Sequence, residues 1–519
     1  KMGAYSGVDY SIISDECGKT SNMLYSSQGH IDANSNFGNS EGYVPRSSQG
    51  TRRDFLKGSA WMLGLAAMSG CMVDKISVGT PAANFRVPAM SKIRVGFIGI
   101  GNRGMAAVRR VSLIPGIETA ALCDLRVEAV DSARNWLKKE RKPGAMHEYK
   151  GAQDSWKGLC DDPDVDVVYI ATPAILHVEM ELYAMRAGKH VLCEVPGAYT
   201  LDECWEIVET SEKTHRHCMM LENCCYGEME MFAWNLAKSG LLGELTHAEG
   251  GYIHNLTARH LENHFRNLKF KNSGAITMNG NIYPTHPLGP ICLYLDINRG
   301  DKMDFLISLS SREAAWSEYI KETFGPDDWQ TGLKINKADM NTTLIKTARG
   351  RTIMLQLDMA TPRPYSRINL IQGSKGCFAD YPPRLALSKV SGGHAKWMSE
   401  KEFSAMRREY MHPLWKQLGE ASKRLGGHDG MDFIMDLRWA YCLQNGLPLD
   451  MDVYDLASWS AIVPCSAKSA LKMGERVEIP DFTRGAWKSA KPLNIGAIDL
   501  KKMNLQLENV KRDDSQLSV

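Results

Sequence analysis

A glycine-rich turn between a buried strand and a helix is the feature of this chain that most restricts its fold. Residues 93–98 form a short apolar run, the pattern Gly-x-Gly-x-x-Gly follows at 99–104, and a helical pattern continues to Leu113. The first glycine of such a turn permits a tight bend, the second lets the backbone approach a pyrophosphate, and the third lets the helix pack closely on the strand. The segment therefore predicts the first βα unit of a dinucleotide-binding domain.

The second expected strand supplies a polar group for the same ligand. It covers 118–123 and ends at Asp124, which follows Gly99 by 25 residues. A carboxylate at this position accepts hydrogen bonds from the adenosine ribose 2′-hydroxyl, which favours NAD over NADP. Arg126 lies close enough to suit the 2′-phosphate of NADP. We interpret it instead as a solvated residue at the start of the next helix.

Three further strands alternate with helices as far as residue 221, so that residues 91–223 form the predicted dinucleotide-binding domain. In an open parallel sheet, ligands bind beyond the carboxyl ends of the strands. The residues that directly follow these strands are therefore expected to line the cofactor: Thr172, Pro173, Glu194, Glu222 and Asn223.

Residues 224–490 follow a different pattern and form a second predicted domain. The stretch 245–253 alternates between apolar and polar residues, and two such runs within 342–359 flank a turn, as in a β-hairpin. The fold class is therefore α/β, with an N-terminal Rossmann domain followed by an α+β domain built on an open, mainly antiparallel sheet. Residues 491–519 are expected to be a C-terminal tail. Helices are expected at 287–297, 413–424, 431–444 and 456–473.

The N-terminal region indicates export. Residues 1–50 are rich in Ser, Asn, Gly and Tyr, and we interpret them as a disordered extension. Residues 51–71 resemble a twin-arginine signal, because the pair Arg52 and Arg53 precedes a short apolar stretch. Cys71 ends a sequence similar to a lipoprotein cleavage box. The protein is therefore expected to be periplasmic or lipid-anchored at the cell envelope; the alternative is a short buried helix with a basic start.

Charge and cysteine content exclude several classes of protein. The chain has 62 Lys and Arg against 60 Asp and Glu, so no basic excess indicates a nucleic-acid partner. Its 13 cysteines include no Cys-x-x-Cys pair and no zinc-type spacing, which in a chain of 519 residues favours buried thiols. An open sheet face often packs against a second subunit, so a homo-oligomer is possible.

Several of these residues carry a resemblance to the Gfo/Idh/MocA oxidoreductase superfamily. The shared elements are the glycine-rich turn, Asp124, the pair Thr172-Pro173, and Glu194-x-Pro196 before a sheet domain. In common dehydrogenases of this superfamily the last of these motifs is Glu-Lys-Pro, and its lysine transfers protons. This chain has Val195 in place of that lysine. The resemblance implies these NAD contacts: Gly99, Gly101, Asn102, Arg103, Gly104, Asp124, Thr172, Pro173, His177, Glu194, Val195 and Asn223.

A closer resemblance, over residues 51–490, is to the NAD-dependent α-N-acetylgalactosaminidases of glycoside hydrolase family 109. It rests on Glu222-Asn223, Tyr252-Ile253-His254, Asn281 to His286, Arg363 to Ser366, and Gly426-Gly427-His428. This chain differs from the family's Gly-Gly-His-Gly-Gly loop, because Asp429 follows the histidine in place of glycine. Residues 256–279 cannot be aligned, so substrate contacts within them stay unassigned.

The resemblance implies an unusual route for cleaving a glycoside, because most glycosidases use two carboxylates. The sugar is oxidised at C3, loses its C2 proton, eliminates the leaving group, adds water and is reduced again, so NAD stays bound. His428 would act as the acid/base at the glycosidic oxygen. The further implied catalytic residues are Tyr252, His254, Tyr283 and His286; the implied substrate contacts are Tyr252, Tyr283, His286, Tyr365 and Glu222.

The local spacing supports these side chains acting together. Tyr252 and His254 are two apart on a strand, so they share a face, and Tyr283 and His286 are three apart at the start of a helix. One alternative is a set of buried, hydrogen-bonded rings. Another is a metal site of His254 and His286 with His260 or His264, which we disfavour because no carboxylate lies at ligand spacing, so no metal is predicted.

Two questions of assignment remain open from the sequence. His394 follows a glycine pair similar to that before His428, but Met431-Asp432-Phe433, which follows the second loop, favours His428.

Three functions are compared: a hydrolase of terminal α-linked N-acetylgalactosamine, a periplasmic sugar oxidoreductase with net redox turnover, and an inactive sugar-binding lipoprotein. Val195 disfavours the second, and the retained Tyr283, His286 and His428 disfavour the third.

Overall fold

The computed structural model describes residues 85–140, 142, 146–262, 278–388 and 395–505. The expected extension at 1–50, the export signal at 51–71 with Cys71, and the last residues of the expected tail lie outside this range. His264 and His394 also lie outside it. Among the described residues, no helix combines the length and hydropathy that crossing a bilayer requires.

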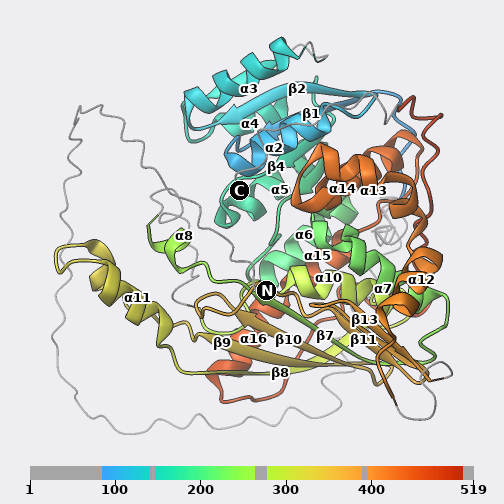
Figure 1. Cartoon of the computed structure of the whole chain (residues 1–519). Helices are drawn as coiled ribbons and strands as arrows, with labels where there is room; N and C mark the ends of the chain where they lie inside the picture. The colour runs from blue at the N-terminus through green and yellow to red at the C-terminus, as the bar shows by residue number, and fades with distance from the viewer. Residues whose placement is uncertain (1–84, 141, 143–145, 263–277, 389–394, 506–519) are drawn as a thin grey trace, which may run out of the picture. The chain divides into compact units, whose positions relative to one another are not determined.

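The first half of the described chain forms a six-stranded parallel sheet in the order β3-β2-β1-β4-β5-β6 (Figure 1). The predicted Rossmann arrangement is therefore confirmed. The edge strand β3 was not predicted, because its sequence His-Glu-Tyr-Lys is polar and lacks the apolar run of a central strand. The strands are β1 (Ile93–Ile98), β2 (Ile117–Asp124), β3 (His147–Lys150), β4 (Val167–Ile170), β5 (His190–Cys193) and β6 (Cys218–Met220).

Helices connect these strands and bury them. Every residue of β4 and β5 is buried, which explains why both strands are short apolar runs without alternation. The last helix starts at a capping box, in which the Thr200 hydroxyl accepts from Glu203 N and the Glu203 carboxylate accepts from Thr200 N. The helices are α2 (Asn102–Val111), α3 (Val127–Lys139), α4 (Ser155–Asp161), α5 (His177–Arg186) and α6 (Leu201–Thr214), with a 3₁₀ turn η1 (Ala174–Leu176) before α5.

The second half contains an eight-stranded sheet in the order β13-β12-β11-β7-β10-β9-β8-β14. Only β7 and β10 pair in parallel, so the sheet is mixed and mainly antiparallel, as predicted. The expected hairpin is β9 with β10. The strands are β7 (Leu245–Ile253), β8 (Met303–Ser310), β9 (Met340–Thr347), β10 (Thr352–Asp358), β11 (Leu370–Gly373), β12 (Gly376–Ala379), β13 (Arg384–Leu387) and β14 (Val477–Glu478).

Central helices connect the two sheets. Helix α15 (Val453–Ser460) packs on α6 and β6 and also contacts α10 (Thr285–Tyr294), which lies on β7 (Figure 1). The expected helix at 456–473 is two helices, α15 and α16 (Ile462–Leu471). The others are α7 (Glu228–Lys238), α8 (Thr257–Leu261), α11 (Ala315–Thr323), α12 (Glu400–Tyr410), α13 (Pro413–Leu425) and α14 (Met431–Gln444); the 3₁₀ turns are η2 (Asn223–Tyr226), η3 (Trp329–Gly332), η4 (His428–Gly430) and η5 (Ala486–Lys488).

Helix α14 brings the second half of the chain to the glycine-rich turn. Twelve of its 14 residues are buried, including Asp432, Asp436 and Arg438. It packs on α2 and β1 of the Rossmann sheet as well as on α13. A segment distant in sequence therefore reaches the region where a dinucleotide is expected.

Candidate active site

The glycine-rich turn has the geometry that a dinucleotide site requires. Gly99 has a φ of +87°, and a Cβ there would lie 2.8 Å from backbone atoms of Ala171 and Thr172. A Cβ on Gly104 would lie 1.8 Å from the Gly99 carbonyl oxygen, so α2 can approach the strand only without a side chain. Gly101 faces open space, with a single atom, Arg126 Nη2, within 4 Å of an added Cβ. That space suits the close approach of a pyrophosphate.

Asp124 lies where the sequence predicted, at the end of β2. Its Oδ2 accepts from Ile100 N at 2.7 Å, and its Oδ1 accepts from Arg126 N at 2.8 Å. The Arg126 side chain donates to the same two oxygens, Nε to Oδ1 at 3.1 Å and Nη2 to Oδ2 at 3.3 Å, so a ribose hydroxyl would replace one of these contacts. Arg126 lies at the start of α3 with its side chain 41% exposed, as we interpreted it, and it also pairs with Asp124, with Nε 3.1 Å from Oδ1. The backbone N–H groups of Ile100 and Arg126 donate to the Asp124 carboxylate and hold it at the turn.

His177 contacts two of the loops that are expected to line the cofactor. It is buried, and its Nδ1 and Nε2 lie 2.9 Å from the carbonyl oxygens of Pro196 and Thr172, respectively. Both ring nitrogens thus face protein carbonyls, which leaves neither for NAD, in contrast to the expected contact. Instead, the ring ties the loop after β4 to the loop after β5. Val195, next to Pro196, is buried and brings no titratable group.

Several expected cofactor residues meet at one buried carboxylate, Asp432. Arg103 Nη1 lies 2.6 Å from Asp432 Oδ2, and Arg103 Nε lies 2.6 Å from Glu194 Oε1. Asn223 Nδ2 donates to Asp432 Oδ1 at 2.6 Å, and His428 Nδ1 lies 3.0 Å from Oδ2. The structure therefore links the glycine-rich turn, the loops after β5 and β6, and the histidine loop through one side chain.

The charge on Asp432 follows from these contacts. Burial alone would raise the pKa of its carboxyl, but the guanidinium groups of Arg103 and Arg110 hold that pKa well below its usual range. Arg110 also pairs with Asp436 at 3.0 Å. The sequence analysis missed these roles of Asp432, Asp436 and Arg110. A usable signal existed: two arginines seven apart on one helix, and two aspartates four apart on another.

The histidine loop has an unusual backbone. Its five residues, from Gly426 to Gly430, all have positive φ, including 45° at His428 and 56° at Asp429. Glycine adopts this region freely, whereas each of the two other residues costs about 1–3 kcal/mol. The His428 side chain is 55% exposed, and its carboxylate partner is Asp432, one helical turn on, rather than Asp429.

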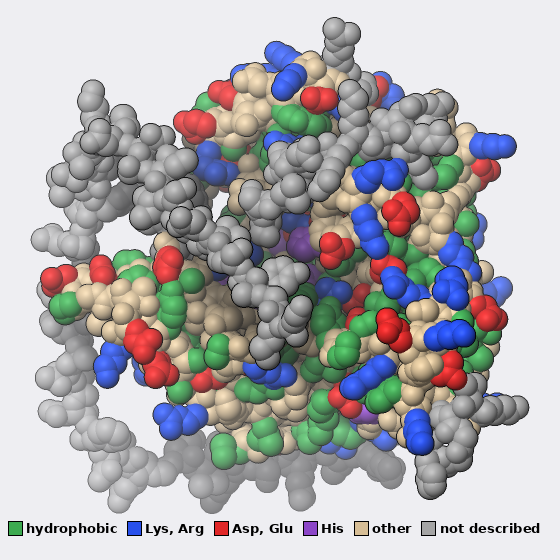
Figure 2. Space-filling view, in the orientation of Figure 1, with side chains coloured by type: hydrophobic (Ala, Val, Ile, Leu, Met, Phe, Trp, Pro, Cys, Tyr) green, Lys and Arg blue, Asp and Glu red, His purple; other side chains and the backbone are tan. Residues whose placement is uncertain are grey.

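Aromatic and histidine side chains form a second cluster beside this network. Tyr252 Oη lies 3.1 Å from His254 Nδ1, and the Tyr252 ring lies 4.8 Å from the Tyr283 ring. The His286 ring lies 5.5 Å from Tyr252, and the Tyr365 ring lies 5.1 Å from His254. The end of β7, the start of α10 and the segment after β10 thus bring all five predicted residues together. Figure 2 shows histidine at the floor of a hollow on this face, with charged side chains around its rim.

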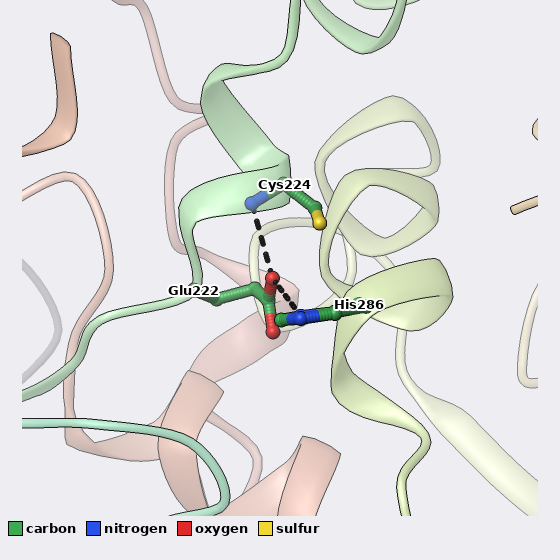
Figure 3. A group of neighbouring side chains, drawn as sticks. All are labelled: Glu222, Cys224 and His286. Carbon is green, nitrogen blue, oxygen red and sulfur yellow. Dashed lines mark hydrogen bonds and ion pairs between the residues drawn. The ribbon is translucent and has the colours of Figure 1, made fainter. Parts of the chain in front are cut away.

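Glu222 fixes the orientation of His286. It is fully buried, and its Oε1 lies 2.7 Å from His286 Nδ1 and accepts from Cys224 N at 3.1 Å (Figure 3). Burial alone would raise the pKa of Glu222, but the neighbouring His286 lowers it below its ordinary value. An ionised carboxylate only accepts, so His286 Nδ1 donates to it, and Nε2 lies 3.4 Å from Tyr283 Oη.

Within the described ranges, His254, His260 and His286 do not form a shared metal site, and the version with His264 lies outside them. Among the described residues around His286, the donors close enough to share an ion are Glu222 and Cys224, not His254. His260 lies in α8, with its ring 6.2 Å from Trp316. Burial raises the pKa of the Cys224 thiol well above its usual range, so the thiol is protonated in the metal-free protein.

Two family models match the two halves of the chain. Residues 93–222 match "Oxidoreductase family, NAD-binding Rossmann fold", and residues 226–489 match "Glycosyl hydrolase 109, C-terminal domain". A glycosyl hydrolase family 109 protein of Shewanella amazonensis is 43% identical over 451 residues, which cover 86% of this chain and 98% of the relative. An α-N-acetylgalactosaminidase of Shewanella oneidensis is 41% identical over 452 residues, with the same coverage.

Solved structures support the fold. A levoglucosan dehydrogenase in complex with NADH and levoglucosan has a TM-score of 0.58 at 19% identity, over 75% of this chain and all of the other. An inositol dehydrogenase homologue of Azotobacter vinelandii, with NADH and myo-inositol, has a TM-score of 0.54 at 17% identity, over 77% of this chain and all of the other. At these identities the likeness concerns the arrangement of the sheets.

Proposed function

The chain belongs to glycosyl hydrolase family 109 and is an NAD-dependent glycosidase, and we propose that it removes terminal α-linked N-acetylgalactosamine from glycans. The observation that carries the proposal is the convergence of Tyr252, Tyr283 and His286 with Glu222, at the carboxyl end of the Rossmann sheet. There a sugar would meet both the nicotinamide and the proton-transfer groups.

The chain's own residues hold the cofactor at defined points. Gly101 and the amino end of α2 would face the pyrophosphate, and Asp124 would accept from the ribose. When bound at these residues, NAD would supply reversible hydride transfer at C3 of the sugar, so net turnover would be redox-neutral. Glu194 and Asn223 border the same region, held by Arg103 and Asp432.

We assign removal of the C2 proton to His286 with Tyr283. The Glu222 carboxylate holds the proton of the neutral imidazole on Nδ1, so Nε2 can accept a proton. Tyr283 lies 3.4 Å from Nε2, and burial raises the pKa of its phenol well above the usual range. The tyrosine therefore stays protonated and can donate a hydrogen bond to the oxygen of the oxidised sugar.

We assign protonation of the leaving group to His428. The ionised Asp432 accepts from Nδ1, so the exposed Nε2 is the atom that meets the glycosidic oxygen. The alternative, a sugar oxidoreductase with net turnover, needs a proton-transfer group where dehydrogenases of the superfamily have lysine. Val195 cannot supply one.

Release of 4-nitrophenol from 4-nitrophenyl α-N-acetylgalactosaminide tests the proposal. Dialysed protein should hydrolyse it with no NAD added, without accumulating NADH. In D₂O the released sugar should carry deuterium at C2, because that proton is removed and returned. Hydrolysis without label at C2 would contradict the mechanism, and net NADH formation would favour the oxidoreductase.

We also propose that the protein is exported and is either periplasmic or lipid-anchored through Cys71. The support is the pair Arg52 and Arg53 before a short apolar stretch that ends at Cys71. Replacing both arginines by lysine should leave the protein in the cytoplasm, and Cys71→Ser should release it from the membrane fraction. Unchanged fractionation of the arginine variant would contradict export.

A further inference from the structure

A cavity of about 160 Å³ lies beside His428 and has no role in the steps above. Its walls include the first turn of α7, Trp415 of α13, and the loop residues His428 and Asp429. Arg367 also lines the cavity and connects it to the aromatic cluster, because its Nη1 donates to Tyr365 Oη at 3.0 Å. The cavity is thus lined by the proposed acid and is one residue away from a proposed sugar contact.

Two of the four carboxylates that line the cavity are neutralised. Glu230 lies 2.7 Å from Arg367 Nη2, and Glu228 pairs with both Arg407 and Lys423. These pairs fix the shape of the wall and add no net negative charge to it.

The other two carboxylates, Asp380 and Asp429, form no ion pair with a described residue. The Asp380 Oδ1 accepts only a backbone hydrogen bond, from Tyr381 N at 2.6 Å. Burial raises the pKa of Asp380 to about 6, so the group is still mostly ionised at neutral pH. Asp429 is exposed and lines the cavity beside His428. Glu228 has two cationic partners, so Asp380 and Asp429 together leave the cavity with one net negative charge while His428 is neutral.

An acid that protonates a glycosidic oxygen lies between the sugar that is released and the group that leaves. A cavity lined by that acid is thus placed to receive the leaving group. We propose that this cavity is the aglycone subsite, and that Asp380 and Asp429 make it accept hydroxyl-bearing neutral or cationic aglycones and reject anionic ones. Carboxylates accept hydrogen bonds from hydroxyl and ammonium groups and repel other anions. The inference rests on the proposed role of His428.

Three benzyl α-N-acetylgalactosaminides test the proposal, with a hydroxymethyl, carboxylate or aminomethyl group at the same ring position. Their leaving alcohols have similar acidity, so the chemical step changes little across the series. With the full chain and its bound NAD, kcat/KM should be about five- to tenfold higher for the hydroxymethyl than for the carboxylate compound, as expected for partly screened charges. The aminomethyl compound should be at least as good as the hydroxymethyl one.

Neutral variants identify the source of this selectivity. Asp380→Asn with Asp429→Asn should bring the hydroxymethyl-to-carboxylate ratio to within about twofold of one, because both unpaired charges are gone. Asp429→Asn alone should lower it partway, and asparagine tolerates the left-handed backbone there, so this variant should fold. Glu420→Gln, exposed on α13 away from the cavity lining, should leave the ratio unchanged.

The aglycone subsite and the proposed function are contradicted by different results. A wild-type ratio near one, or a ratio that both aspartate variants leave unchanged, would overturn the subsite while hydrolysis persists. If the NAD-loaded protein cleaves none of the three compounds, nor the nitrophenyl glycoside, the proposed function itself is wrong.

Discussion

At the scale of single residues, Asp432 shows how a charge can organise a site without touching the substrate. Its two oxygens meet Arg103, Asn223 and His428, and none of these contacts is local except the last. A buried carboxylate with two arginine partners stays ionised, so it can hold the histidine ring in one orientation. Asp432 is therefore a positioning residue for the proposed acid.

For substrates with poor leaving groups, Asp432→Asn should lower kcat by about 10- to 100-fold and raise KM by less. The His428 ring loses the carboxylate that accepts from its Nδ1, so its Nε2 is no longer held in one orientation. Asp436→Asn is the control, because Asp436 shares Arg110 but not His428. An equal loss of kcat in both variants would indicate a merely structural role.

His428→Ala should separate substrates by their leaving group. For alkyl glycosides kcat/KM should fall by about 10²–10⁴-fold, the usual contribution of a general acid. For the 4-nitrophenyl glycoside the fall should be much smaller, because nitrophenolate leaves without a proton. A plot of log kcat/KM against leaving-group acidity should therefore steepen in the variant. Equal losses for both classes would assign His428 a different task.

Sequence reasoning found the polar residues at strand ends and in motifs but not their partners. Tyr252, Tyr283 and His286 could be placed together because local spacing and a family pattern both apply to them. Asp432 and Arg110 could not, since their pairing joins positions more than 300 residues apart and depends on how α14 packs on α2. Both ring nitrogens of His177 face carbonyls supplied by the fold, which no local pattern reveals.

At the scale of elements, apolar runs and turns predicted the central strands well. Polar edge strands such as β3 carry no such signal, because one side of the strand faces solvent. The break between α15 and α16 was also missed. All eight residues of α15 are buried, so the apolar residues of this helix show no single face whose interruption would indicate its end.

The glycine-rich turn allows a matched pair of substitutions. Gly104→Ala puts a methyl group 1.8 Å from the Gly99 carbonyl, so α2 must move away from the strand. We expect a loss of roughly 2–4 kcal/mol in the free energy of unfolding, together with loss of NAD. Gly101→Ala puts the methyl group in open space, so the thermal midpoint should change little while NAD retention after gel filtration falls. Equal destabilisation by both would contradict separate roles for the two glycines.

At the scale of the whole molecule, buried histidines make stability depend on pH. Burial lowers the pKa of His190 to about 4, of His217 to about 3 and of His412 to about 4. An unfolded histidine titrates near pH 6.5. Between pH 6.5 and about 4 the unfolded chain therefore binds protons that the folded chain does not, and stability falls as the pH falls.

His217→Leu should flatten this acid loss. The folded pKa of His217 is depressed, so its neutral form contributes fully above pH 6.5, and the contribution is lost on acidification at about 1.4 kcal/mol for each pKa unit. Leucine cannot titrate, so the fall in the free energy of unfolding between pH 7 and pH 4.5, from urea titrations, should be smaller by roughly 2 kcal/mol. Whatever packing the leucine loses against Phe85 should be the same at every pH.

His147→Gln should change the pH dependence in the opposite direction. A hydrogen bond from its ring to Asp162 raises the pKa of His147, so its contribution is present below pH 6.5 and disappears as the pH rises through the folded value. Removing it should therefore destabilise the protein more at pH 5 than at pH 8. If the two substitutions change the slope of stability against pH in opposite directions, desolvation controls the pKa of His217, directly before β6, and the contact with Asp162 controls that of His147 in β3. Changes of the same sign would contradict this.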